Sequence, residues 1–189
     1  MPDSNGNLTS ATTQVRFGGV GGQGIVLAGR LLGKAAALFD DKEAVVTQTY
    51  GPEARGGAAR TDVIISDSTV DYPFVTNADV LAVLFQEAYG KFRPGLKPGG
   101  TLIFDEGLVQ PGADDKAVRG VPATKIAEEL GNRLAANVVI LGYLVGKTGV
   151  VSRESVEEAI RATLKEKIVD LNLQALDAGI KLAQSNGSS

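Results

Sequence analysis

Six residues near the start of the chain, Gly19-Val20-Gly21-Gly22-Gln23-Gly24, match the pattern G-x-G-x-x-G. They follow a predicted strand at residues 14–17 and open a predicted helix at residues 24–39, which is the context that this pattern requires. Glycines permit a tight turn and a close approach to a phosphate, and the amides at a helix start can hold an anion. Three interpretations stay open: a turn needed only for packing, a site for another phosphate-bearing group, or a dinucleotide site.

A dinucleotide site also needs an acidic residue about 20 positions further on, which binds the ribose. Asp40, Asp41 and Glu43 have suitable positions in the sequence. However, the predicted second strand begins at Glu43, and its far end, where such an acid normally lies, is Thr49. The interpretation as an NAD or FAD site is therefore weakened.

A second glycine-rich segment, residues 47–57, begins in the last residues of the predicted strand 43–49. Gly56 and Gly57 come directly after Arg55, so the backbone can turn sharply and leave the guanidinium projecting. Arginine is well suited to binding phosphate or carboxylate, and open α/β sheets place ligands at the carboxyl ends of their strands. The alternative is a structural loop in which Glu53 and Arg55 are simply solvated.

The elements that would position these residues alternate along the chain. Apolar runs predict strands at residues 14–17, 43–49, 58–66, 79–85 and 101–105. Helical spacing predicts helices at residues 24–39, 122–130, 137–147 and 152–163, and a last helix that carries Val169, Leu173, Leu176 and Ile180. This order predicts an α/β fold with a Rossmann-like open, mostly parallel sheet, flanking helices and a helical C-terminal part.

Smaller features complete this prediction. Residues 89–97 are expected to form a short helix or turn, residues 98–100 to separate it from the next strand, and residues 107–120 to be irregular. Gly142 and Gly146, four residues apart in one predicted helix, would let a neighbouring backbone approach closely. Residues 1–13 are expected to be a disordered leader, residues 14–183 a single domain, and residues 184–189 a flexible tail.

Composition excludes several kinds of site. The chain has 189 residues and contains no Cys and no His, so it cannot itself bind an iron–sulfur cluster through Cys or build a Ser-His-Asp triad. The net charge of −3, without long blocks of one sign, does not suggest nucleic-acid binding. No segment approaches the roughly 20 apolar residues of a membrane span, and the polar start lacks the apolar core of a signal peptide, so a cytoplasmic location is expected.

Two stretches together resemble a known family. GGVGGQGIVLAGRLLGKAA and TYGPEARGGAARTDVIIS, in this order, resemble the γ subunit of 2-oxoacid:ferredoxin oxidoreductases, and the stretch that begins at Asn137 is similar to a later helix start of that family. The resemblance covers residues 14–183 and is greatest to the 2-oxoglutarate branch, also called 2-oxoglutarate synthase. The pyruvate, branched-chain, aryl-pyruvate and phenylglyoxylate branches share the same motifs.

The resemblance implies an enzyme complex that converts a 2-oxoacid and coenzyme A to an acyl-CoA, CO2 and reduced ferredoxin. Thiamine diphosphate would lie between α and β subunits, and 4Fe-4S clusters would lie in a ferredoxin-like subunit or domain. In this chain the resemblance implies a coenzyme A edge formed by Gly19, Gly21, Gly22, Gln23, Gly24, Arg55, Gly56, Gly57 and Asn137. Asn137 has a structural alternative, because Asn is also a favoured N-cap.

Three classes of function therefore compete: an accessory subunit of a redox enzyme, a stand-alone dinucleotide-dependent oxidoreductase, and a binding module without an enzymatic partner. A stand-alone reductase would need Tyr or Lys as its proton donor, because His and Cys are absent. Tyr143 and Lys147 have suitable spacing, but they lie in a strongly apolar predicted helix. We interpret them as core packing with a lysine whose amine reaches solvent.

Overall fold

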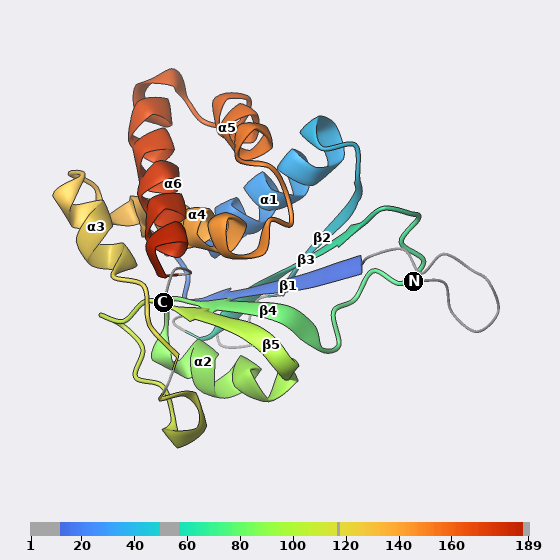
Figure 1. Cartoon of the computed structure of the whole chain (residues 1–189), viewed down its shortest axis with the longest axis vertical. Coiled ribbons are helices and arrows are strands. Elements are labelled where there is room, and N and C mark those ends of the chain that lie inside the picture. Colours follow the sequence, from blue (N-terminus) through green and yellow to red (C-terminus); the bar gives the residue numbers. More distant parts are fainter. Residues whose placement is uncertain (1–11, 50–56, 117, 187–189) are drawn as a thin grey trace.

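The computed structural model describes residues 12–49, 57–116 and 118–186. A twisted sheet forms the middle layer, with α2 on one face and the remaining helices on the other (Figure 1). The strands are β1 (Thr12–Gly19), β2 (Glu43–Thr49), β3 (Ala59–Ser66), β4 (Ala78–Val83) and β5 (Leu96–Phe104). The helices are α1 (Ile25–Phe39), α2 (Gln86–Phe92), α3 (Ala123–Glu129), α4 (Ala136–Thr148), α5 (Arg153–Arg161) and α6 (Glu166–Asn186), with 3-10 turns η1 (Arg93–Gly95), η2 (Ala113–Asp115) and η3 (Arg133–Ala135).

The strand order is β2-β3-β1-β4-β5. β1 pairs in parallel with β4, and β4 with β5, whereas β3 is antiparallel to both β1 and β2. Four strands therefore run in one direction and only β3 is reversed. This confirms the predicted α/β class with a mostly parallel sheet. The carboxyl ends of β1, β2, β4 and β5 consequently lie together along one boundary of the sheet, here called the carboxyl edge. The glycine turn lies at this carboxyl edge.

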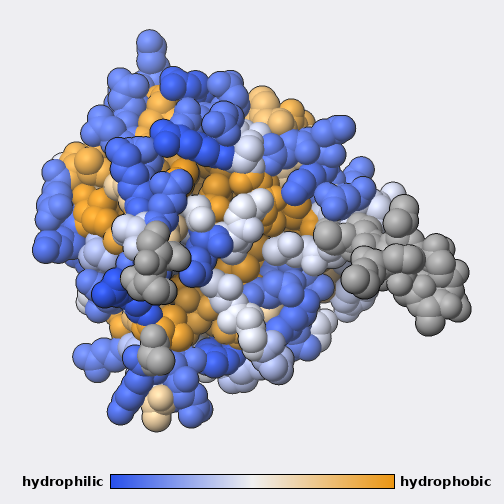
Figure 2. All heavy atoms as spheres, in the orientation of Figure 1, coloured by the Kyte–Doolittle hydropathy of each residue, from blue (hydrophilic) through white to orange (hydrophobic). Residues whose placement is uncertain are grey.

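The main core lies between the sheet and the helices on the face opposite α2. Its side chains are small and branched, as the low aromatic content predicts, and Val15, Leu32, Val63, Ile140 and Leu176 are all less than 2% exposed. A smaller cluster packs α2 against β4 and β5. On the face seen in Figure 2, hydrophobic atoms are visible between the helical layer and the sheet, with hydrophilic atoms around them.

Helices α4 and α6 pack closely because glycines lie at their contact. A Cβ atom on Gly142 would overlap the carbonyl oxygen of Leu176, and one on Gly179 would overlap that of Val139. A Cβ on Gly146 would lie 2.9 Å from the Cβ of Ala183. The prediction that Gly142 and Gly146 allow a close backbone approach is confirmed, and the neighbour is α6.

The region before β5 differs from its prediction. The short helix begins at Gln86 and ends at Phe92, and β5 begins at Leu96, five residues before the predicted start at Thr101. Pro98 and Gly99 therefore lie inside the strand instead of before it. The strand accommodates them because β5 is an edge strand, where a missing N–H costs no ladder bond, and because its pairing with β4 is irregular between Ala78 and Val80.

The ends of the described chain extend regular structure slightly beyond the predicted domain. β1 includes Thr12 and Thr13, and α6 continues to Asn186. The rest of the predicted leader and tail, residues 1–11 and 187–189, lies outside the described residues. Among the helices that the structure describes, none is long and apolar enough to cross a membrane.

Candidate functional site

The glycine turn connects β1 to α1 at the carboxyl edge of the sheet. The side chain of Gln23 holds it: the Val20 amide donates to Gln23 Oε1 at 2.8 Å, and Gln23 Nε2 donates to the Leu84 carbonyl at 2.6 Å. Both polar ends of Gln23 are therefore used within the protein. This residue ties the turn to the end of β4, so its structural role is to position the turn.

The start of α1 presents backbone donors. The first bond within the helix runs from the Ala28 amide to the Gly24 carbonyl at 3.0 Å, so the amides of Ile25, Val26 and Leu27 have no acceptor within α1. Gly24 supplies no side-chain cap, and the first turn contains no acidic residue. Free amides and the positive end of the helix dipole together favour a negatively charged group at this point.

The four glycines named for this turn fall into two groups. A Cβ on Gly19 would lie 2.7 Å from Ile25 Cγ2, and a Cβ on Gly24 would overlap the Asn137 amide, so both are packed against the protein. Gly21 and Gly22 are exposed, and a Cβ on either would meet nothing within 4 Å. Gly22 and Gly24 also have positive φ angles of 92° and 73°. The exposed pair leaves open backbone that an external group can approach.

A hollow of about 370 Å³ lies over this exposed backbone. It is lined by the turn, by the first residues of α1, by Arg30 and by Ala59 at the start of β3. Arg30 is exposed and has no ion-pair partner among the described residues. Sequence reasoning missed Arg30, although its place three residues after Leu27 puts both on one side of α1. An anion in the hollow would meet a guanidinium as well as the helix start.

Asn137 supports the turn from α4. Its side chain is 1% exposed, and Nδ2 donates to the Gly24 carbonyl at 2.8 Å. The N-cap of α4 is Ala135, so the suggested alternative of Asn137 as an N-cap is wrong: the residue lies one position inside the helix. Its hydrogen bond couples two segments that are 113 residues apart. The residue type indicated a polar role, but the sequence carried no signal for this partner.

The second glycine-rich segment is only partly described. Arg55 and Gly56 lie outside the described residues. Gly57 precedes β3, whose residue Ala59 pairs with Gly19, so the end of this segment comes to the same sheet edge as the glycine turn. The convergence of both segments on one edge is the arrangement that an open α/β sheet predicts for a ligand site.

The acids considered for ribose binding lie elsewhere. Asp40 follows α1 at the opposite edge of the sheet, where it accepts hydrogen bonds from the Ser152 amide at 2.6 Å and the Ser152 hydroxyl at 2.8 Å. Burial tends to raise the pKa of Asp40, but hydrogen bonds from Ser155 and Ser152 lower it overall. Asp40 therefore joins α1 to α5. A dinucleotide site would need one of these acids beside the glycine turn, and Asp40, Asp41 and Glu43 all lie between the end of α1 and the start of β2.

Comparisons with known proteins identify the family of this chain. Residues 14–182 match the family described as pyruvate ferredoxin/flavodoxin oxidoreductase. The chain is 45% identical over 175 residues to the 2-oxoglutarate synthase subunit KorC of Methanocaldococcus jannaschii, covering 90% of this chain and 94% of that protein.

Solved structures give the same result. The γ subunit of a keto/oxoacid ferredoxin oxidoreductase from Geobacter sulfurreducens superimposes with a TM-score of 0.82 at 40% identity, over 93% of this chain and 98% of that one. The 2-oxoglutarate:ferredoxin oxidoreductase of Magnetococcus marinus, solved with 2-oxoglutarate, coenzyme A and succinyl-CoA bound, also has a TM-score of 0.82, at 26% identity; 92% of this chain matches 31% of that protein. This chain therefore belongs to the pyruvate ferredoxin/flavodoxin oxidoreductase family and is a γ-type subunit within it.

Proposed function

We propose that the chain serves in a 2-oxoglutarate:ferredoxin oxidoreductase, which converts 2-oxoglutarate and coenzyme A to an acyl-CoA, CO2 and reduced ferredoxin. The identity to subunits named for 2-oxoglutarate synthase supports this substrate over the pyruvate, aryl-pyruvate and phenylglyoxylate alternatives. The partners would be thiamine-binding α and β subunits, a subunit or domain with 4Fe-4S clusters, and ferredoxin as acceptor, all in the cytoplasm. Thiamine diphosphate, held by the partner subunits, would supply the carbanion-stabilising chemistry that decarboxylation needs.

The part of this chain would be to hold a phosphate of coenzyme A at the glycine turn. The observation that carries this proposal is the combination of open backbone at Gly21 and Gly22 with free amides at the start of α1. Arg30 adds a positive charge to the same hollow. We infer from the family resemblance that Arg55, with Gly56 and Gly57, would add a second. These groups suit a phosphate, because all of them donate hydrogen bonds or carry positive charge.

The test places a carboxylate on the turn without disturbing the fold. Gly21 has no positive φ and open space around its Cβ position, so Gly21→Asp should fold normally and repel a phosphate. In the assembled complex, the variant should raise the KM for coenzyme A at least tenfold and leave that for 2-oxoglutarate unchanged. Viologen dye reduction measures both constants.

Gly90→Asp is the matched control. Gly90 lies on α2, across the sheet from the turn, and its Cβ position is equally open. This variant should keep both KM values. If Gly21→Asp also keeps them, the turn does not bind coenzyme A. If the chain by itself oxidises a substrate with NAD, the stand-alone Rossmann oxidoreductase replaces the subunit proposal.

A further inference from the structure

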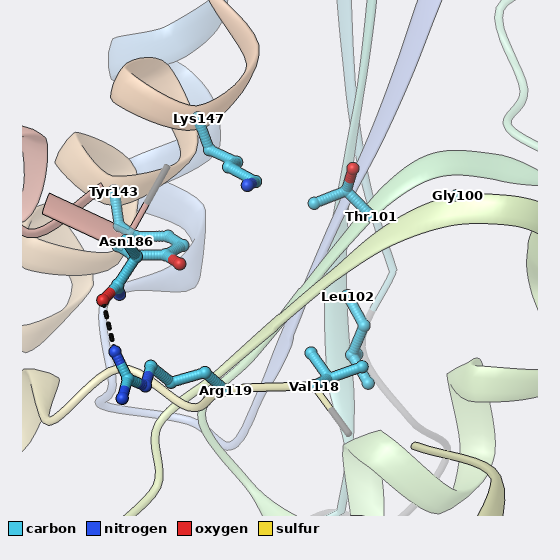
Figure 3. A pocket seen from close by; sticks show the side chains of 8 residues that line it. All are labelled: Gly100, Thr101, Leu102, Val118, Arg119, Tyr143, Lys147 and Asn186. Atoms are coloured by element: carbon cyan, nitrogen blue, oxygen red, sulfur yellow. Dashed lines mark hydrogen bonds between the residues drawn. The ribbon is translucent and has the colours of Figure 1, made fainter. Parts of the chain in front are cut away.

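A second hollow, of about 430 Å³, lies between the middle of β5 and the C-terminal parts of α4 and α6. It is separate from the glycine turn: Asn137, which contacts the turn, and Lys147, which lines this hollow, are ten residues apart on α4, or about 15 Å along the helix axis. Figure 3 shows the hydroxyl of Tyr143 and the amine of Lys147 directed into the space between α4 and β5. Nothing in the proposed coenzyme A role uses these groups.

Tyr143 is the central feature of this hollow. The residue is only 6% exposed, yet its hydroxyl lines the hollow and has no hydrogen-bond partner among the described residues. A phenol that is almost buried normally has a partner for its hydroxyl. Lys147, one helical turn further on, is exposed and has no carboxylate partner in the described part of the chain. The four-residue spacing of Tyr143 and Lys147, which we interpreted as core packing, thus brings a hydroxyl and an amine to the same hollow.

A second pair of donors lies at the end of α6. Arg119 donates from Nη1 to Asn186 Oδ1 at 2.8 Å, which uses the acceptor of that amide. Asn186 Nδ2 is buried and has no partner within the described residues. The hollow is therefore rich in donors, and none of the described residues that line it is an Asp or Glu. An occupant must bring acceptor atoms, and the basic side chains of Arg119 and Lys147 favour an occupant with negative charge.

The remaining wall is formed by β5 and Val118, and it is apolar except for Thr101, which carries a hydroxyl. Leu102 of β5 and Val118 face the donors across the hollow, as Figure 3 shows. We propose that this hollow binds a small organic anion, whose carboxylate or phosphate group meets Tyr143 and Lys147 and whose short apolar body lies against Leu102 and Val118. Its volume is in the range of small-molecule sites, which commonly have a few polar groups in a largely apolar wall.

Four probes separate the contributions of charge and apolar surface: acetate, butyrate, inorganic phosphate and butyl phosphate. Each is titrated into the isotope-labelled full chain, and the amide resonances of Gly100, Thr101, Tyr143 and Lys147 are followed by NMR. At least one of the two anionic groups, carboxylate or phosphate, should shift these resonances at millimolar concentration. For that group, the probe with the longer alkyl chain (butyrate or butyl phosphate) should bind more tightly than the probe without it (acetate or inorganic phosphate). The resonances of residues 21–25 report binding at the glycine turn separately.

Tyr143→Phe removes only the hydroxyl, and Lys147→Gln removes the charge. Each should weaken the best probe roughly tenfold, the effect of losing one charge-assisted hydrogen bond. Lys167→Gln, at an exposed lysine in the first turn of α6, is the control and should leave the affinity unchanged. The proposal is overturned if no probe shifts the resonances of this hollow, if shifts occur only at the glycine turn, or if both variants bind as the wild type does.

Discussion

Gly21, Gly22 and Gly24 differ in how strictly the fold of the turn requires them. Gly24 has a φ of 73°, and Asn137 occupies the space that its Cβ would need. Gly22 has a φ of 92° but open space, so only its backbone conformation excludes other residues. Gly21 has neither restriction. The fold therefore requires Gly24 and disfavours replacement of Gly22, whereas only an approaching ligand would require Gly21.

Asn137→Ala should lower the free energy of unfolding by about 1–3 kcal/mol, because it removes a buried hydrogen bond to the Gly24 carbonyl. Urea denaturation of the full chain measures this change. Asn77→Ala is the control, since Asn77 is exposed and should be replaceable without effect. Equal stability of both variants would mean that the contact between α4 and the glycine turn contributes nothing.

Arg55→Ala should raise the KM for coenzyme A roughly ten- to a hundredfold and spare that for the 2-oxoacid, because a charge-assisted hydrogen bond contributes about 1.5–3 kcal/mol. Steady-state kinetics of the assembled complex separate the two constants. Arg161→Ala, at an exposed position of α5, should change neither. A rise in the 2-oxoacid constant alone would place Arg55 at the substrate, and no rise would make it structural.

At the scale of elements, the helices and most strands follow from hydrophobic spacing, whereas contacts between distant segments do not. The repeated apolar positions of α6 are visible in the sequence because a helix buries one side. The start of β5 was not predictable from local signals, since Pro98 and Gly99 normally end a strand and are accommodated here only at a sheet edge. Likewise, Asn137 contacts Gly24 only because the fold brings α4 against the turn.

The contact between α4 and α6 gives a prediction for one element pair. Gly179→Ala should destabilise the chain by several kcal/mol, because its Cβ would overlap Val139 and lie 2.7 Å from the Tyr143 amide nitrogen, so the helices must separate. The same substitution at Gly90 should stabilise by up to about 1 kcal/mol, because this helical position is open and Ala has the higher helix propensity. Thermal unfolding of the two variants should therefore shift in opposite directions.

The segment between β5 and α3 is anchored to α2 and η1 by a carboxylate. Asp115 accepts from Arg93 Nε at 2.6 Å and from the Tyr89 hydroxyl at 2.7 Å. The hydrogen bond from Arg93 is the main cause that lowers the pKa of Asp115, against the opposing effect of burial. A carboxylate with a lowered folded-state pKa contributes stability above its unfolded pKa of about 3.9, and this contribution disappears as pH falls through the folded pKa.

Asp115→Asn should therefore lower stability at neutral pH and reduce the loss of stability on acidification below about pH 4. Urea midpoints measured from neutral pH downward give both quantities. Asp114→Asn is the control, because the carboxylate of Asp114 is exposed and makes no ion pair among the described residues. Parallel pH curves for wild type and Asp115→Asn would show that this carboxylate does not couple folding to protonation.

At the scale of the whole molecule, the surface next to the glycine turn is suited to contact with other subunits. Leu134 is 68% exposed and lines two further hollows that meet at Gly22. We expect a partner subunit to cover Leu134 because of its place beside the proposed coenzyme A site, since its exposure alone would not distinguish it from Leu38. Interfaces of permanent complexes are comparatively apolar and commonly exceed about 2,000 Å². The coenzyme A site would then be completed only by assembly.

The chain alone should consequently show no oxidation of 2-oxoglutarate and no tight binding of NAD. It has no Cys for a cluster and no His for proton transfer, and Asp40 is engaged with Ser152 at the far edge of the sheet. Co-expressed with thiamine- and cluster-binding subunits, it should purify with them in fixed stoichiometry and restore reduction of ferredoxin or a viologen dye that depends on both 2-oxoglutarate and coenzyme A.

Leu134→Asp should weaken the association of this chain with those subunits, whereas Leu38→Asp, at an equally exposed leucine at the end of α1, should not. A complex that forms and turns over fully without this chain would contradict its role as a subunit.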